Sequence, residues 1–224
     1  YTFKLSSIII CLFFSLLVQT LEVTKKAVTI TAGSDTKVYD GTALTKDSYT
    51  NSDLVAGDSI ESVTITGIQT DAGESANVPS EAVIKNVNGE DVTASYDITY
   101  ENGTLEVNKK QVTISGITST DKTYDGTTDA ELDYSDIDWS ACGMVDGDEL
   151  SVTAKGTYED TSAGEDKNVA ITDLNLDGAS VNNYILAEDG HQTRANAKIT
   201  KKAVTVTALK QTVAVNGEIE NSVD

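Results

Sequence analysis

The sequence predicts an all-β fold, made of tandem small antiparallel β-sandwich domains of the Ig-like kind. Three observations favour it. Apolar and polar residues alternate at every second position along many short segments, Thr and Val recur throughout, and glycine-containing turn signals separate the segments. No stretch holds a convincing helical period, so a β-grasp fold, which needs a helix, is the runner-up.

Each predicted strand follows from the alternation, because one face of a strand is buried while the other faces water. The clearest segments, in chain order, are Val28/Ile30, Val63/Ile65, Tyr96/Ile98, Leu105/Val107, Val152/Ala154, Val169/Ile171, Ala197/Ile199 and Val204/Val206. Turns are expected at Asp40-Gly41, Asn88-Gly89, Asn102-Gly103, Asp146-Gly147 and Asp177-Gly178. Short strands between closely spaced turns are typical of a sandwich.

The chain repeats itself. The Lys pair Lys25-Lys26 recurs as Lys109-Lys110 and Lys201-Lys202, each time followed by an alternating apolar segment. Between these marks the matches stay in order: Tyr39-Asp40-Gly41 with Tyr124-Asp125-Gly126, Ala72-Gly73-Glu74 with Ala163-Gly164-Glu165, and Tyr96 with Tyr184. Such a colinear series indicates repeated domains.

These matches predict a first β repeat at 25–108, a second at 109–200 and the truncated start of a third at 201–224. Residues 21–24 correspond to the last strand of an upstream repeat. Residues 1–20 hold an apolar run that is either a signal-like export segment or no part of the fold.

Composition excludes several function classes. Asp and Glu number 36 against 16 Lys and Arg, which gives a net charge of −20 and disfavours nucleic-acid binding. One His and two Cys leave little material for His-based catalysis, a zinc site or disulfides. His191 stands in a polar turn with no nucleophile motif beside it. We therefore expect no enzyme activity, no catalytic residue and no cofactor.

The repeated Lys-x-Tyr-Asp-Gly-Thr motif, the Ala-Gly-Glu, the late Tyr and the closing Lys-Lys-x-Val-Thr resemble the YDG/MBG-type repeat domains of bacterial cell-surface, adhesin-like proteins. The second repeat looks closest to the YDG type and the first to the sister MBG type. The resemblance covers about residues 21–224. It implies a β architecture and an extracellular place on the bacterial surface or cell wall, and it implies no catalytic activity.

The Tyr-Asp-Gly motif has two readings, a ligand site or a structural turn. We favour the turn, in which Asp caps the backbone, Gly supplies a positive φ and Tyr packs beside them. The four repeat-matched tyrosines are expected to be buried: Tyr39, Tyr96, Tyr124 and Tyr184.

Two further features suggest ligands. Trp139 lies in an insertion of the second repeat and is a candidate ligand contact. Oxygen ligands suited to calcium cluster in the acidic loops, but none fits an EF-hand, so we favour a solvated acidic surface and predict no metal site. The acidic residues are Asp136, Asp138, Asp146, Asp148, Glu149, Asp173 and Asp177.

Together these patterns predict a non-catalytic stalk region that spaces or presents an adhesive or other functional domain. The alternative is a carbohydrate- or protein-binding module whose ligand site lies on the repeats. The expected partners are a host or neighbouring-cell surface protein or a glycan, and membrane contact is expected only through an N-terminal export segment. The short junctions at the Lys pairs leave no flexible linker, so we expect a monomeric rod.

Overall fold

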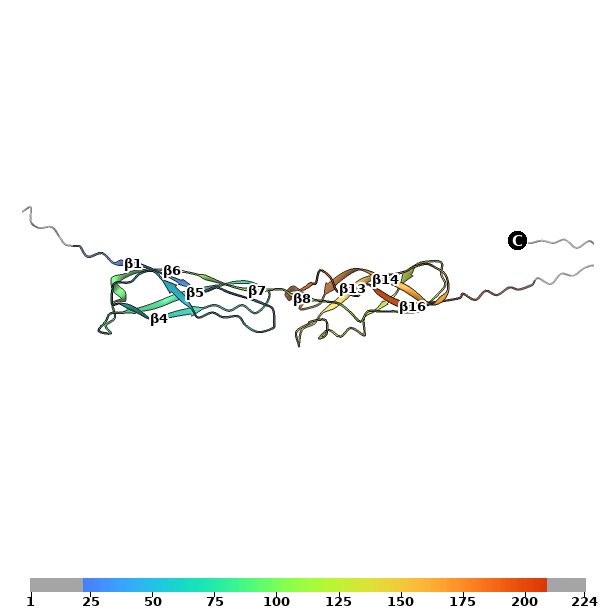
Figure 1. Ribbon diagram of the computed structural model, residues 1–224, viewed down its shortest axis with the longest axis horizontal. Coiled ribbons are helices and arrows are strands. Elements are labelled where there is room, and N and C mark those ends of the chain that lie inside the picture. Colours follow the sequence, from blue (N-terminus) through green and yellow to red (C-terminus); the bar gives the residue numbers. More distant parts are fainter. Residues whose placement is uncertain (1–21, 209–224) are drawn as a thin grey trace, which may run out of the picture. The chain divides into compact units, whose positions relative to one another are not determined.

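The computed structural model describes residues 22–208, and these fold into two compact units (Figure 1). Unit 1 runs to Lys110 and also includes Asn182–Ile185. Unit 2 comprises Gln111–Val181 and the chain from Leu186 onward. The apolar segment at 1–20 and most of the expected third repeat lie outside the described residues.

The described residues are all-β, as the alternation predicted. Their only helical elements are two 3-10 turns, η1 (Thr93–Ser95) and η2 (Val181–Asn183). The strands of unit 1 are β1 (Lys26–Ala32), β2 (Asp35–Val38), β3 (Tyr49–Asn51), β4 (Ser59–Thr66), β5 (Gly73–Lys85), β6 (Tyr96–Glu101) and β7 (Gly103–Asn108). They form two sheets with the orders β3-β1-β6 and β2-β7-β5-β4.

Unit 2 has one larger sheet, of order β10-β16-β14-β13-β11, and a small β12-β9 ribbon. Its strands are β9 (Thr118–Ser119), β10 (Lys122–Thr123), β11 (Asp129–Ala130), β12 (Leu132–Asp133), β13 (Ser151–Tyr158), β14 (Gly164–Asp177) and β16 (Arg194–Thr200). The remaining strands, β8 (Lys110–Val112) and β15 (Tyr184–Leu186), each cross a boundary between the two units.

The expectation of purely antiparallel sheets was wrong in three places. β1 pairs in parallel with β6, β2 with β7, and β10 with β16. In each case a strand from the early part of a repeat lies beside a strand from its late part. In unit 1 the paired strands run in the same direction, which requires an even number of chain reversals between them.

Between the two parallel ladders of unit 1, the backbone at Gly103 passes very close to the backbone at Gly33. β1 and β6 pair from Lys26↔Tyr96 to Thr31↔Glu101, and β2 and β7 continue from Asp35↔Leu105. A Cβ on Gly103 would lie only 2.2 Å from the carbonyl oxygen of Gly33. Only glycine fits at position 103, so the Asn102-Gly103 turn signal marks a contact between strands.

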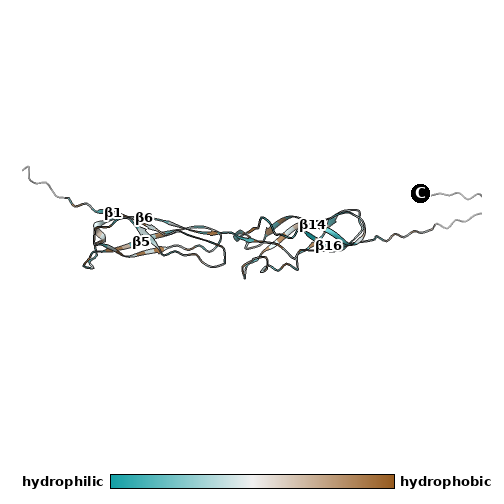
Figure 2. Ribbon diagram, in the orientation of Figure 1, coloured by the Kyte–Doolittle hydropathy of each residue, from teal (hydrophilic) through white to brown (hydrophobic). Residues whose placement is uncertain are grey.

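Apolar residues of the alternating segments form a core in each unit, and Figure 2 shows them in brown along the strands. In unit 1, Val28, Ile84 and Tyr96 pack together, with Ile60 and Ile98 at the edge. In unit 2 the cluster consists of Tyr158, Val169, Ala197 and Ile199, with Ala130, Leu132 and Ala195 against it.

The segment predicted as a strand by Val204 and Val206 has no regular secondary structure, and both side chains are exposed. A strand buries its apolar face only when a neighbour covers it. No described strand pairs with residues 201–208.

Candidate functional site

The Lys-x-Tyr-Asp-Gly-Thr motif forms a closed turn at the end of the parallel ladder in unit 1. Asp40 Oδ1 accepts hydrogen bonds from the Thr42 backbone N–H (2.9 Å) and the Thr42 hydroxyl (2.7 Å). Lys37 Nζ lies 2.6 Å from the same oxygen. Gly41 has φ of 78°, a conformation that side chains other than glycine rarely adopt.

Unit 2 builds the same turn from the matching residues. Asp125 Oδ1 accepts from the Thr127 backbone N–H (2.8 Å) and hydroxyl (2.9 Å), and Lys122 Nζ lies 3.0 Å away. Lys122 also donates to the Asp129 carbonyl (2.9 Å), and its ammonium lies 5.3 Å from the centre of the Tyr158 ring. The amine and the carboxylate are thus engaged with neighbours in their own unit.

These contacts stabilise the charged carboxylates. The Lys37 amine, followed by the Thr42 hydroxyl and N–H, holds the pKa of Asp40 far below its ordinary value. The Thr127 N–H, followed by the Lys122 amine, lowers the pKa of Asp125 to about 2. Both aspartates therefore remain charged acceptors that close the turn, which fits the structural reading of the motif.

The motif tyrosines differ, and here one expectation was wrong. Tyr39 is 5% exposed, and its ring meets the Tyr184 ring edge to face at 5.5 Å within unit 1. Tyr124 is 42% exposed, although it was expected to be buried. The difference arises because residues 182–185 cover the turn in unit 1, and burial by a distant segment cannot be seen in a local motif.

The structure places Trp139 half-buried in a run of turns, where its carbonyl accepts a hydrogen bond from Met144 N–H (2.9 Å). Its role as a ligand contact stays a prediction.

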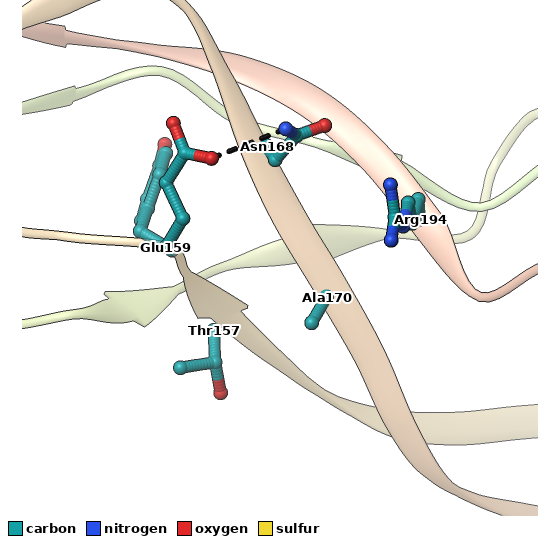
Figure 3. A pocket seen from close by; sticks show the side chains of 6 residues that line it. Thr157, Glu159, Asn168, Ala170 and Arg194 are labelled. Atoms are coloured by element: carbon teal, nitrogen blue, oxygen red, sulfur yellow. Dashed lines mark hydrogen bonds between the residues drawn. The ribbon is translucent and has the colours of Figure 1, made fainter.

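A shallow hollow of about 250 Å³ lies on unit 2 between β13, β14 and β16. Glu159, Asn168 and Arg194 line it with Thr157, Tyr158 and Ala170. In Figure 3 the Asn168 amide donates to the Glu159 carboxylate (3.1 Å), and Arg194 lies on the other side of Asn168. Sequence reasoning did not single out these residues, because they come from three separate strands.

Two of the acidic loop residues accept hydrogen bonds from backbone N–H groups in their own turns, and a third accepts from a distant serine. Asp138 accepts from Ala141 N–H (3.1 Å) and Asp177 from Gly178 N–H (2.8 Å), while Ser180 Oγ donates to Asp148 (3.2 Å). Across residues 22–208 no group of three or more His, Cys, Asp or Glu side chains is placed to hold a metal ion.

The side chains of His191 and Gln192 bond to the early backbone of unit 2, beside a main-chain bond from Gln192 N–H to the Ile114 carbonyl (2.9 Å). His191 Nδ1 accepts from Ile114 N–H (3.0 Å), and Nε2 lies 2.8 Å from the Ala187 carbonyl. Gln192 Oε1 accepts from the N–H groups of Gly116 and Ile117, both at 2.9 Å. Sequence reasoning missed this role, since nothing local shows that these side chains face a distant backbone.

Residues 108–192 match the family model described as the YDG domain. This confirms the resemblance for that stretch, which corresponds closely to the second repeat. No curated protein and no solved structure matches the chain significantly. Within the part of the chain that the structure describes, no helix has the length and apolar character needed to cross a membrane.

Proposed function

We propose that the two units are tandem Ig-like β-sandwich repeats in a stalk of a bacterial cell-surface or cell-wall protein. They have no catalytic role and space or present an adhesive or other functional domain. The YDG match at 108–192 supports the choice of repeat type, and the engaged motif residues support a structural role for the turns.

One observation carries this proposal: the two earliest strands of unit 1, β1 and β2, run parallel to its two latest strands, β6 and β7. Residues 26–38 pair with residues 96–108 in the same direction, so the chain enters near one end of the unit and leaves near the other. Thirteen extended residues cover about 40 Å. A repeat with this topology adds length to a chain of domains.

The same topology suits a part that bears load. If force is applied to the two ends of unit 1, the parallel ladder is sheared, and its hydrogen bonds resist together rather than opening one after another. Unit 2 has the same arrangement in shorter form, with Lys122↔Ile199 and Thr123↔Thr200 in register. Tyr124 N–H adds a bond to the Thr200 carbonyl (2.8 Å).

Single-molecule pulling of the full chain from its two ends tests the proposal. We expect two unfolding events that need high force, one for each unit. Gly103→Ala should lower the force for unit 1 alone, because it disturbs the parallel ladder there. Units that extend at negligible force, with no change on substitution, would contradict a load-bearing stalk.

The alternative, a carbohydrate- or protein-binding module, is favoured by the hollow at Glu159, Asn168 and Arg194, whose polar groups suit sugar hydroxyls. Trp139 is a second candidate contact. A glycan array probed with the full chain, Trp139→Ala and Arg194→Ala tests it. Specific binding that either substitution removes would establish the alternative, and binding unchanged in both would exclude these two residues as the site.

A further inference from the structure

In unit 1, Asn183 and Tyr184 pack into a socket beside the Tyr-Asp-Gly turn. Tyr39, Asp71 and Ala72 form this socket. The Asn183 amide oxygen accepts from Ala72 N–H (2.8 Å), and its nitrogen donates to Asp71 Oδ1 (3.0 Å). The next residue, Tyr184, meets the ring of Tyr39 edge to face. Asn183 and Tyr184 are both buried, so this is a packed contact with matched polar groups.

Unit 2 contains the corresponding socket. The strand registers set the equivalence: Gly73 pairs with Val107 in unit 1, and Gly164 pairs with Ile199 in unit 2. Ala72 precedes Gly73, and Ala163 precedes Gly164. Ser162 and Ala163 of unit 2 therefore occupy the positions that Asp71 and Ala72 occupy in unit 1. The matching tyrosine is Tyr124.

This second socket is open. Tyr124 is 42% exposed, against 5% for Tyr39, and both Ser162 and Ala163 are exposed. Its chemistry would accept the same occupant. The Ala163 backbone can donate to an amide oxygen, the Ser162 hydroxyl can accept from an amide nitrogen, and the Tyr124 ring offers a face to an aromatic edge.

We propose that Tyr124, Ser162 and Ala163 form a docking site for an Asn-Tyr turn like that at 181–186, supplied by a further repeat of the same type. The occupied socket of unit 1 specifies this occupant. The proposal rests on the proposed function only in that a further repeat supplies the turn, and it concerns docking rather than load.

The test replaces residues 201–224 with a copy of residues 109–200, so that Lys109-Lys110 of the copy follow Thr200 and keep the Lys-Lys junction. Hydrogen exchange of individual amides is then followed by NMR. We expect the Ala163 amide to exchange about tenfold more slowly in the extended chain, the factor that a hydrogen bond of ordinary net strength supplies. The protection should disappear when the added copy carries Asn183→Ala.

The matched control is Asn183→Ala in the original chain, which should speed exchange at Ala72 by a similar factor. If Asn183→Ala leaves the exchange rate of the Ala72 amide unchanged, Asn183 does not protect this amide in unit 1, and the proposal is overturned. Ala163 protection that survives Asn183→Ala in the copy would show that another part of the repeat covers the socket. Protection that rises with concentration in the unextended chain would assign the site to a second copy. Either result overturns the proposal. Pulling is measured on the unextended chain, so the two proposals can fail separately.

Discussion

Units 1 and 2 hold the early part of their chain against the late part by different means. Unit 1 uses backbone ladders, with six register pairs between β1 and β6 and four between β2 and β7. Unit 2 has two such pairs between β10 and β16. In the preceding stretch the Ala187 N–H bonds to the Val112 carbonyl (3.0 Å) and the Gln192 N–H to the Ile114 carbonyl (2.9 Å), and the side chains of His191 and Gln192 add further bonds. The comparison teaches that the same parallel pairing can rest mainly on backbone ladders, with Ser34 Oγ accepting from Thr104 N–H (2.9 Å) between them, or on fewer backbone bonds supplemented by side chains.

The largest effect is expected from Gly103→Ala in unit 1. Its Cβ would lie 2.2 Å from the Gly33 carbonyl oxygen and 2.7 Å from that of Ala32, so the backbones would have to separate. We expect unit 1 to lose about 3 kcal/mol or more of its free energy of unfolding, as severe overpacking does. Denaturant unfolding of the full chain measures this.

Gly89→Ala is the matched control, because nothing lies within 4 Å of the added Cβ and only the positive φ of 78° opposes it. It should cost about 1 kcal/mol. Equal losses for the two variants would mean that close approach of the strands does not limit unit 1.

The next largest effect is expected from the two motif tyrosines, whose removal should destabilise the two units by different amounts. Tyr39→Ala removes a buried ring and its contact with Tyr184, so unit 1 should lose about 3 kcal/mol. Tyr124→Ala removes a ring that is 42% exposed, and unit 2 should lose about 1 kcal/mol or less. Urea unfolding of both variants gives the difference, and similar losses would contradict the contrast in burial.

Gln192→Ala tests the side-chain closure of unit 2. It leaves the N–H groups of Gly116 and Ile117 without their acceptor, and Ile117 is buried. We expect a loss of about 2 kcal/mol in unit 2, because a buried unsatisfied donor is costly. The exposed Gln111→Ala serves as the control and should change little. A loss seen in unit 1 instead would show that the side chain supports something else.

The smallest effect is the pH dependence of the two turns. Asp125 has a pKa of about 2 in the folded chain, below its ordinary 3.8, so its stabilisation is complete above about pH 4 and is lost as the pH falls toward 2. The pKa of Asp40 is lower still, so its contribution survives further into acid. Both carboxylates are exposed, which keeps the effect small.

Melting temperatures between pH 5 and pH 2 check this. Asp125→Asn should make unit 2 less sensitive to acid in this range, and Asp40→Asn should do the same for unit 1, where the loss continues further into acid. If the melting temperatures of both variants fall with pH as steeply as those of the unsubstituted chain, the stability of the turns does not depend on the charge of these carboxylates.

Much of the fold could be predicted because alternation is a local property. Val28, Leu105, Val169 and Ile199 are buried as their pattern indicated, and the Asp-Gly turn of each Tyr-Asp-Gly motif forms where it was expected. Exposure of Tyr124 and the bridging role of Gln192 could not be predicted, since each depends on which distant segment lies opposite.

By itself the sequence determined that the described chain is built of strands, that the Asp and Gly of each motif form a turn, and that residues 108–192 carry the YDG pattern. The tertiary structure alone decided that early and late strands of a unit pair in parallel, and that Asn183 and Tyr184 cover one motif tyrosine while the other stays exposed. The physical reason is range. Turn closure joins residues a few positions apart, whereas strand direction and burial depend on segments 70 or more residues away in the chain.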